Sequence, residues 1–151
     1  MATIKHVSVS AQQLNGFTIE AQARNRKVII DQPESSGGKN CGPNPLEYLF
    51  FSLSGCIITI GHIIARQRRL PVRNIQVRVE GELDGDVLMG RSIEPRAGFT
   101  GIRVITTIDA DMSLEEKEQF LRDIDARCPI SDNIHNLTPV ELVVEEIPVT
   151  A

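Results

Sequence analysis

NPLEYLFFSLSGCIITIGHII, residues 44–64, predicts a long helix that is apolar on every side. Asn44 is typical of an N-cap, and Pro45 suits the first helical position. Glu47 then falls where its side chain can reach back to the cap and complete a capping box. A helix that is apolar all round must be covered by other elements or by a second chain.

The same run is long enough to be weighed as a membrane span. Residues 48–65 carry no charged side chain and just reach the ~18-residue length of a spanning helix. Small and polar residues dilute the run, however: Ser52, Ser54, Gly55, Thr59 and His62. The flanking sequence is patterned for soluble sheet, so we expect no membrane partner.

The composition indicates one soluble globular domain over residues 1–151, because 41% of the residues are apolar and 24% are charged. The net charge of -4, without a Lys/Arg tract, argues against nucleic-acid binding. The three cysteines, Cys41, Cys56 and Cys128, form no CxxC pair, so we expect neither a disulfide scaffold nor a metal site. The N-terminus lacks a signal-peptide core, and we expect a cytoplasmic protein.

Alternating apolar residues and turn residues predict an α+β fold with antiparallel hairpins. The expected strands are 3–10, 17–24, 27–31, 74–83, 98–110 and 139–149. Ser113 and Glu116 form a capping box that opens a second helix, which ends near Arg127. Cys128 before Pro129 is typical of the N-cap and first position of a third, short helix.

Two of the cysteines stand in contrasting settings. Cys56, taken alone, is typical of a core cysteine, and burial raises the pKa of such a thiol. Cys128, as an N-cap, would hold its sulfur among free backbone N–H groups, either as a cap alone or as a reactive thiol. A shielded and a poised thiol suit peroxide reduction, in which one becomes a sulfenic acid and the other resolves it as a disulfide. The sequence leaves open whether the two sulfurs meet.

Three motifs resemble the OsmC/Ohr family over nearly the whole chain. They are GPNPLEYLFFSLSGC at 42–56, RCPISDNI at 127–134 and TPVE at 138–141. The resemblance implies an intertwined homodimer whose long central helices are wrapped by antiparallel sheets from both chains. It also implies a cofactor-free thiol peroxidase for organic hydroperoxides that is recycled by a dithiol reductant, often lipoyl-type. Cys56 matches the peroxidatic cysteine and Cys128 the resolving one.

The sequence departs from the family pattern at the helix start. Peroxidase members keep a carboxylate directly after the proline, paired with an arginine from the N-terminal segment. Here Leu46 takes that place and Glu47 follows, rotated by about 100° around the helix. Glu47 therefore either serves the partner's site or only completes the capping box. Arg24 is the first candidate for the activating arginine and Arg26 the second.

Two classes of function follow from these residues. The first is the peroxidase, with an apolar wall for a lipid-like substrate formed by Leu49, Phe50, Phe51 and Leu53, although these residues would serve equally as dimer core. The second is a non-enzymatic dimer that binds a hydrophobic ligand or senses redox state, which the shifted glutamate favours. A different thiol chemistry, such as disulfide exchange, is the third possibility.

Overall fold

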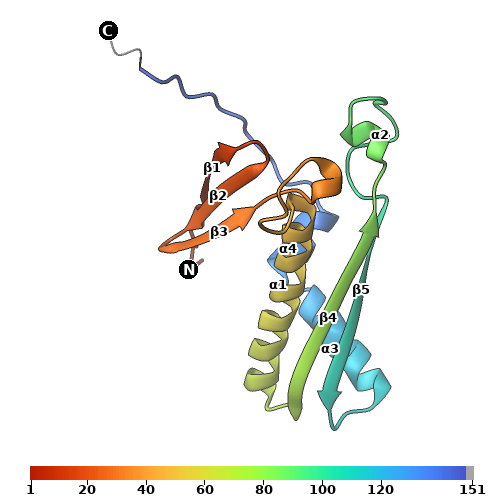
Figure 1. Cartoon of the computed structure of the whole chain (residues 1–151). Coiled ribbons are helices and arrows are strands. Elements are labelled where there is room, and N and C mark those ends of the chain that lie inside the picture. Colours follow the sequence, from red (N-terminus) through yellow and green to blue (C-terminus); the bar gives the residue numbers. More distant parts are fainter. Residues whose placement is uncertain (149–151) are drawn as a thin grey trace. The chain divides into compact units, whose positions relative to one another are not determined.

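Two antiparallel sheets and one long helix make up the computed structural model, which describes residues 1–148 (Figure 1). The α+β class predicted from the sequence is therefore confirmed. The chain divides into two compact units, one of residues 1–55 and 78–105, the other of residues 56–77 and the chain from Thr106 on. The long helix and both strands of the second sheet contribute to each unit.

The first sheet is a three-stranded meander in the order β1-β2-β3. Its strands are β1 (Ser10–Asn15), β2 (Thr18–Ala23) and β3 (Arg26–Ile30). The two turns place Gly16 and Arg24 at positive φ, 58° and 57°. The strand expected at 3–10 is wrong apart from Ser10, which pairs with Gln22 near the end of β2. Residues before Ser10 run past the short partner strand and have nothing there to pair with.

A buried carboxylate organises the loop that follows β3. The side chain of Asp31 is 1% exposed and accepts hydrogen bonds from the backbone N–H groups of Gln32, Lys39 and Cys41 and from the hydroxyl of Thr18. Burial opposes ionisation, but these donors, led by Cys41, outweigh it and hold the pKa of Asp31 below its ordinary value. The loop, which contains the short 3-10 helix η1 (Glu34–Ser36), is thus held by hydrogen bonds to the buried carboxylate of Asp31.

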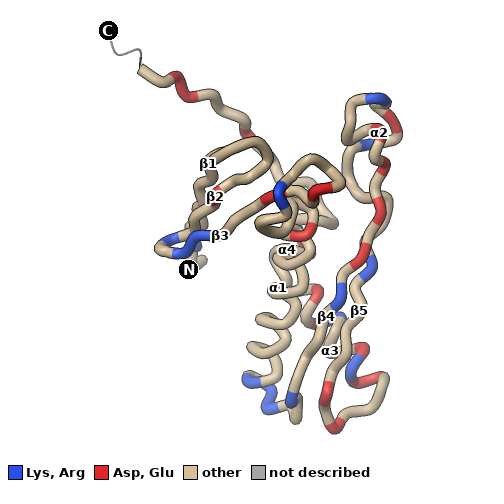
Figure 2. Tube along the Cα trace, in the orientation of Figure 1, with Lys and Arg blue, Asp and Glu red and all other residues tan. Residues whose placement is uncertain are grey.

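The long helix, α1 (Pro45–Arg68), begins and ends as its sequence predicts. The amide of Glu47 donates to Asn44 Oδ1 at 2.9 Å, and the amide of Asn44 donates to a Glu47 carboxylate oxygen at 2.7 Å. Arg69, at a φ of 55°, ends the helix before Pro71. Figure 2 shows that charge is confined to the two ends of α1.

Part of α1 forms the core of the second unit. Ile57 and Ile64 are buried, and Gly61 lies against two further elements. A Cβ atom at Gly61 would stand 2.6 Å from Cδ1 of Ile75 and 3.0 Å from Cδ1 of Ile124. Because glycine has no side chain, the side chains of Ile75 and Ile124 can approach the helix at this position.

The rest of α1 is open in the single chain. By length and composition alone the helix is apolar enough to cross a membrane, and 28% of its most apolar 18-residue window is buried. Its exposed residues include Phe51, Gly55, Ile58 and His62, which recur at helical spacing along one face.

The second sheet pairs two long strands, β4 (Val72–Glu82) and β5 (Gly101–Ala110), which run antiparallel in Figure 1. Their connection contains α2 (Gly85–Leu88), a single turn that the sequence did not indicate. After β5 come α3 (Leu114–Asp125), with the predicted Ser113–Glu116 capping box, and α4 (Pro129–His135), with Cys128 as its N-cap. Both helix starts are confirmed.

The strand predicted at 139–149 is absent from its described residues. Residues 137–148 are irregular and exposed, with Leu142 and Val144 more than nine-tenths accessible, and Val149 lies outside the described residues. A strand forms only against a partner edge. No strand edge of residues 1–148 pairs with this segment.

Candidate thiol site

The structure brings Cys56 and Cys128 into contact. The two Sγ atoms, from residues 72 positions apart, lie 2.8 Å from each other, within hydrogen-bonding distance. A disulfide bond is about 2.05 Å long, so no disulfide joins the two cysteines. Both thiols are free, and their sulfurs are less than about 1 Å farther apart than bonded sulfurs would be. Both residues belong to the second unit, where α1 supplies Cys56 and the start of α4 supplies Cys128.

The first turn of α4 directs its free amides at the two sulfurs. Pro129, at the first helical position, has no N–H to donate. The amide of Ile130 donates to the sulfur of Cys56, and the amide of Ser131 donates to Cys128 Sγ at 3.4 Å. The Cys-Pro sequence at this helix start therefore fixes both sulfurs with the groups that every helix leaves unpaired.

The two thiols differ in burial. Cys128 is 1% exposed, whereas Cys56 is half-buried. Burial and the hydrogen bond shared with Cys128 raise the pKa of Cys56, and the amide of Ile130 lowers it only in part. Among residues 1–148 no cation contributes to this shift. At neutral pH the structure as it stands thus favours the Cys56 thiol over the thiolate.

A polar group beside Cys128 was missed in the sequence. Ser131 is 4% exposed, and its hydroxyl contacts the carboxylate of Asp125 and lies 3.2 Å from Nδ1 of His135. The four-residue spacing of Ser131 and His135 was the available signal, because it puts both on one helix face. The same spacing of polar residues occurs on ordinary solvated helix surfaces, so the sequence alone gave no reason to single out Ser131 and His135.

Glu47 and Arg24 both belong to the first unit. Glu47 makes the two capping-box bonds at the start of α1. Arg24 is exposed in the β2–β3 turn, where its carbonyl accepts a hydrogen bond from Gln22, and Arg26 beside it is exposed as well. Cys41, also in this unit, is exposed, and its sulfur lies 3.7 Å from the carbonyl oxygen of Lys39.

The four apolar residues predicted as a substrate wall divide by burial. Leu53 is 3% exposed and fills the core, and Phe50 stacks on Phe99 with ring centroids 4.7 Å apart. Leu49 and Phe51 are 38% and 57% exposed, respectively. Only these two therefore present a broad apolar surface.

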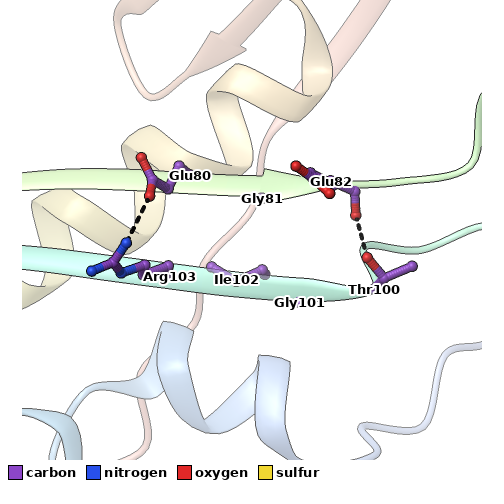
Figure 3. Close-up of a pocket in the computed structure, with 7 residues that line it drawn as sticks. All are labelled: Glu80, Gly81, Glu82, Thr100, Gly101, Ile102 and Arg103. Carbon is purple, nitrogen blue, oxygen red and sulfur yellow. Dashed lines mark hydrogen bonds and ion pairs between the residues drawn. The ribbon is translucent and has the colours of Figure 1, made fainter.

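One open hollow of about 630 Å³ lies over the β4–β5 ribbon (Figure 3). The hollow is lined by Glu80, Gly81, Glu82, Thr100, Gly101, Ile102 and Arg103, with Glu80 and Arg103 paired at 3.6 Å. The hollow contains neither thiol. Residues 1–148 hold no cluster of three His, Cys, Asp or Glu side chains suited to a metal ion.

Comparison with known proteins identifies the family of this chain. Residues 36–143 match the family described as OsmC-like protein. The structure is similar to the OsmC-like protein of Mycoplasma pneumoniae, with a TM-score of 0.78 and 17% identity over 89% of this chain and 91% of that one. No curated protein sequence matches the chain.

Two further similar structures are organic hydroperoxide resistance proteins. OsmC of Legionella pneumophila gives a TM-score of 0.65 with 18% identity, over 88% of this chain and 91% of that one. The protein of Elizabethkingia anophelis, with thiocyanate bound, gives 0.65 with 17% identity, over 91% and 93%. At these identities the likeness is one of fold.

Proposed function

The chain belongs to the OsmC-like protein family, and on that premise we propose that it is a thiol-dependent peroxidase that reduces organic hydroperoxides. Cys56 is the peroxidatic thiol and Cys128 the resolving thiol. The observation that carries the proposal is the 2.8 Å contact between their sulfurs. Family members known as organic hydroperoxide resistance proteins share the fold and supply the substrate class.

The proposed cycle has three balanced steps. The Cys56 thiol first loses its proton to solvent, and the thiolate attacks the O–O bond of ROOH. The O–O bond breaks, Cys56 keeps the hydroxyl as a sulfenic acid, and the alkoxide takes up a proton from solvent and leaves as ROH. The Cys128 sulfur then attacks the Cys56 sulfur, the S–O bond breaks, and water leaves with the proton of the Cys128 thiol. A dithiol reductant, of lipoyl or other type, reduces the disulfide by thiol exchange and is itself oxidised to a disulfide. A reducing compartment such as the cytoplasm suits this last step.

A cation near Cys56 would favour the first step, because burial and Cys128 raise the pKa of that thiol. We propose Arg24 for this role, because a guanidinium stabilises a thiolate and donates to a departing oxygen. For Glu47 we propose the capping role, which its two hydrogen bonds with Asn44 support.

We further propose that the working unit is a homodimer. The exposed apolar face of α1 and the unpaired apolar segment 137–148 are surfaces that a second copy would cover. Leu49 and Phe51, which are exposed on α1, would then either border the substrate or pack in the dimer core.

Removal of each sulfur separately tests the cycle. The Cys56→Ser protein should consume no cumene hydroperoxide in a dithiol-coupled assay, because the attacking atom is gone. Without the dithiol, the Cys128→Ser protein should consume one equivalent of hydroperoxide and stop, with Cys56 detected as sulfenic acid by mass spectrometry. Cys41→Ser is the matched control and should retain turnover. Hydroperoxide consumption by Cys56→Ser at the control rate would contradict the assignment.

A second candidate function, a non-enzymatic dimer that senses redox state or carries a hydrophobic ligand, is favoured by the raised pKa of Cys56. It predicts that Cys56 reacts with hydroperoxide only slowly and that a ligand accompanies the protein through purification. Mass spectrometry of the native protein and the rate of the first turnover distinguish the two functions.

A further inference from the structure

Ser131 is a buried polar residue whose hydroxyl contacts two polar side chains. Its hydroxyl oxygen contacts Asp125 Oδ1 and lies 3.2 Å from His135 Nδ1. The same Nδ1 lies 2.9 Å from the backbone carbonyl oxygen of Ser131. A carbonyl only accepts, so in the tautomer that carries a hydrogen on Nδ1 this nitrogen donates to the oxygens of Ser131. In that tautomer the serine hydroxyl donates its own proton to the carboxylate of Asp125.

This network joins the end of one helix to both ends of the next. Asp125 is the last residue of α3, Ser131 lies in the first turn of α4, and His135 is the last residue of α4. The link from α3 to Cys128 is short, and the amide of Cys128 donates to the carbonyl of Asp125 at 3.2 Å. The position of Ser131 is therefore set by α3, by α4 and by this tight link together.

Ser131 also contacts the resolving sulfur. Its amide is 3.4 Å from Cys128 Sγ, so the residue whose side chain is held by Asp125 and His135 is the one that holds the thiol. Cys128 has little freedom of its own, since it is 1% exposed. Because Ile124 of α3 lies against α1 at Gly61, a shift of α4 relative to α3 would also shift Cys128 relative to Cys56 on α1.

We propose that Ser131, held by Asp125 and His135, is a positioning residue for disulfide closure between Cys128 and Cys56. The inference rests on the proposed function for its role in peroxide reduction. In closure the Cys128 sulfur bonds to the Cys56 sulfur, the leaving group departs from Cys56, and the proton of the Cys128 thiol goes to that leaving group. The network acts before this step by holding the two sulfurs in contact.

An aromatic disulfide such as DTNB tests closure without peroxide. In the Cys41→Ser background, Cys56 displaces one aromatic thiolate and forms a mixed disulfide, and Cys128 then displaces the second aromatic thiolate as it closes the ring. Two absorbance phases are expected. The Cys41→Ser/Cys128→Ser protein should show the first phase alone, which assigns the phases.

We expect Ser131→Ala to slow the second phase about tenfold relative to the first, the size of a lost hydrogen bond to a charged group. Asp125→Ala should do the same, whereas Asp125→Asn keeps an acceptor for the serine proton and should restore closure. Asp132→Asn is the matched control, since Asp132 is on α4 but bonds to Asn136 instead.

A purely structural role would lower the melting temperature without changing the ratio of the two phases. Equal ratios in Ser131→Ala, Asp125→Ala and the Asp132→Asn control would overturn the proposal. If Ser131→Ala fails to fold, the contrast between Asp125→Ala and Asp125→Asn decides it. If Cys56 forms no sulfenic acid with cumene hydroperoxide, the proposed function fails while the aromatic disulfide still measures positioning.

Discussion

At the scale of single residues, Cys56 combines a favourable position with an unfavourable environment. Its sulfur touches Cys128 and accepts a hydrogen bond from the amide of Ile130, yet burial and Cys128 raise its pKa. The contact serves the resolving step, and the raised pKa opposes the first step. A cation that reached Cys56 would lower this pKa and so favour the first step.

The pH dependence of Cys56 alkylation tests the proposed arginine in the Cys41→Ser/Cys128→Ser background. With Arg24→Ala added, burial dominates, and the iodoacetamide rate should rise with a midpoint above the ordinary cysteine pKa of 9.0. With Arg24 present the midpoint should lie lower, because the cation stabilises the thiolate.

Arg26→Ala is the matched control and should leave the midpoint where Arg24 sets it. Coincident profiles with and without Arg24 would show that Arg24 is not the activating cation. A fall in the alkylation rate only when Arg26 is removed would transfer the role to the second candidate.

The sequence predicted which cysteine caps a helix but not that the two sulfurs meet. Cys128 before Pro129 defines a helix start by local chemistry alone, and the structure confirms it. The contact with Cys56 depends on how α1 and α4 pack across 72 residues of chain, which no local pattern records. The contact between Asp125 and Ser131 was missed for the same reason, because only the burial of Ser131 distinguishes this contact from one on the protein surface.

At the scale of elements, the start of α1 assigns Glu47 to a capping box. Asn44→Ala should lower the free energy of unfolding by about 1 kcal/mol, because the amide of Glu47 loses its acceptor. Chemical denaturation monitored by circular dichroism measures the change. Glu47→Gln keeps an oxygen for the amide of Asn44 and should retain both stability and the rate of hydroperoxide reduction.

A Glu47→Gln protein that keeps its stability but loses activity would contradict a role for Glu47 in capping alone. If Glu47→Gln unfolds like the parent protein but reduces hydroperoxide more slowly, the charge itself takes part in catalysis. Ser113→Ala is a control for the cost of a lost cap, because its capping box lies at the other end of α3 from Asp125 and on a different helix from Glu47.

Elements with local start signals were predicted well, and elements that depend on distant partners were not. The helices α1, α3 and α4 each begin at the residue that their capping pattern indicates. The terminal segments 3–9 and 139–148 alternate like strands but form none among the described residues. Alternation gives a segment the capacity to pair, and pairing itself requires an edge that the single chain does not offer them.

At the scale of the whole molecule, the exposed face of α1 predicts association. Ile58 is 39% exposed on this face, and a Cβ atom added to Gly55 would meet nothing within 4 Å. Light scattering should show a dimer for the parent protein and a monomer or a shifted equilibrium for Ile58→Arg, because a charge on a covered apolar face is costly.

Leu114→Arg is the matched control for this substitution. Leu114 is 74% exposed at the start of α3, on a different helix from the α1 face, and its replacement should leave the dimer intact. A parent protein that remains monomeric at high concentration would contradict the homodimer. An Ile58→Arg protein that remains fully dimeric would place the interface elsewhere.

The apolar segment at 137–148 also has a consequence for solubility. Val140, Leu142, Val143 and Val144 leave a row of strand-forming side chains in water, the kind of segment that seeds aggregation. Its glutamates, together with Pro148, interrupt the run as gatekeepers that discourage stacking of like chains. We therefore expect the acidic residues of this segment to oppose unspecific self-association while they leave it free to pair with a specific strand edge.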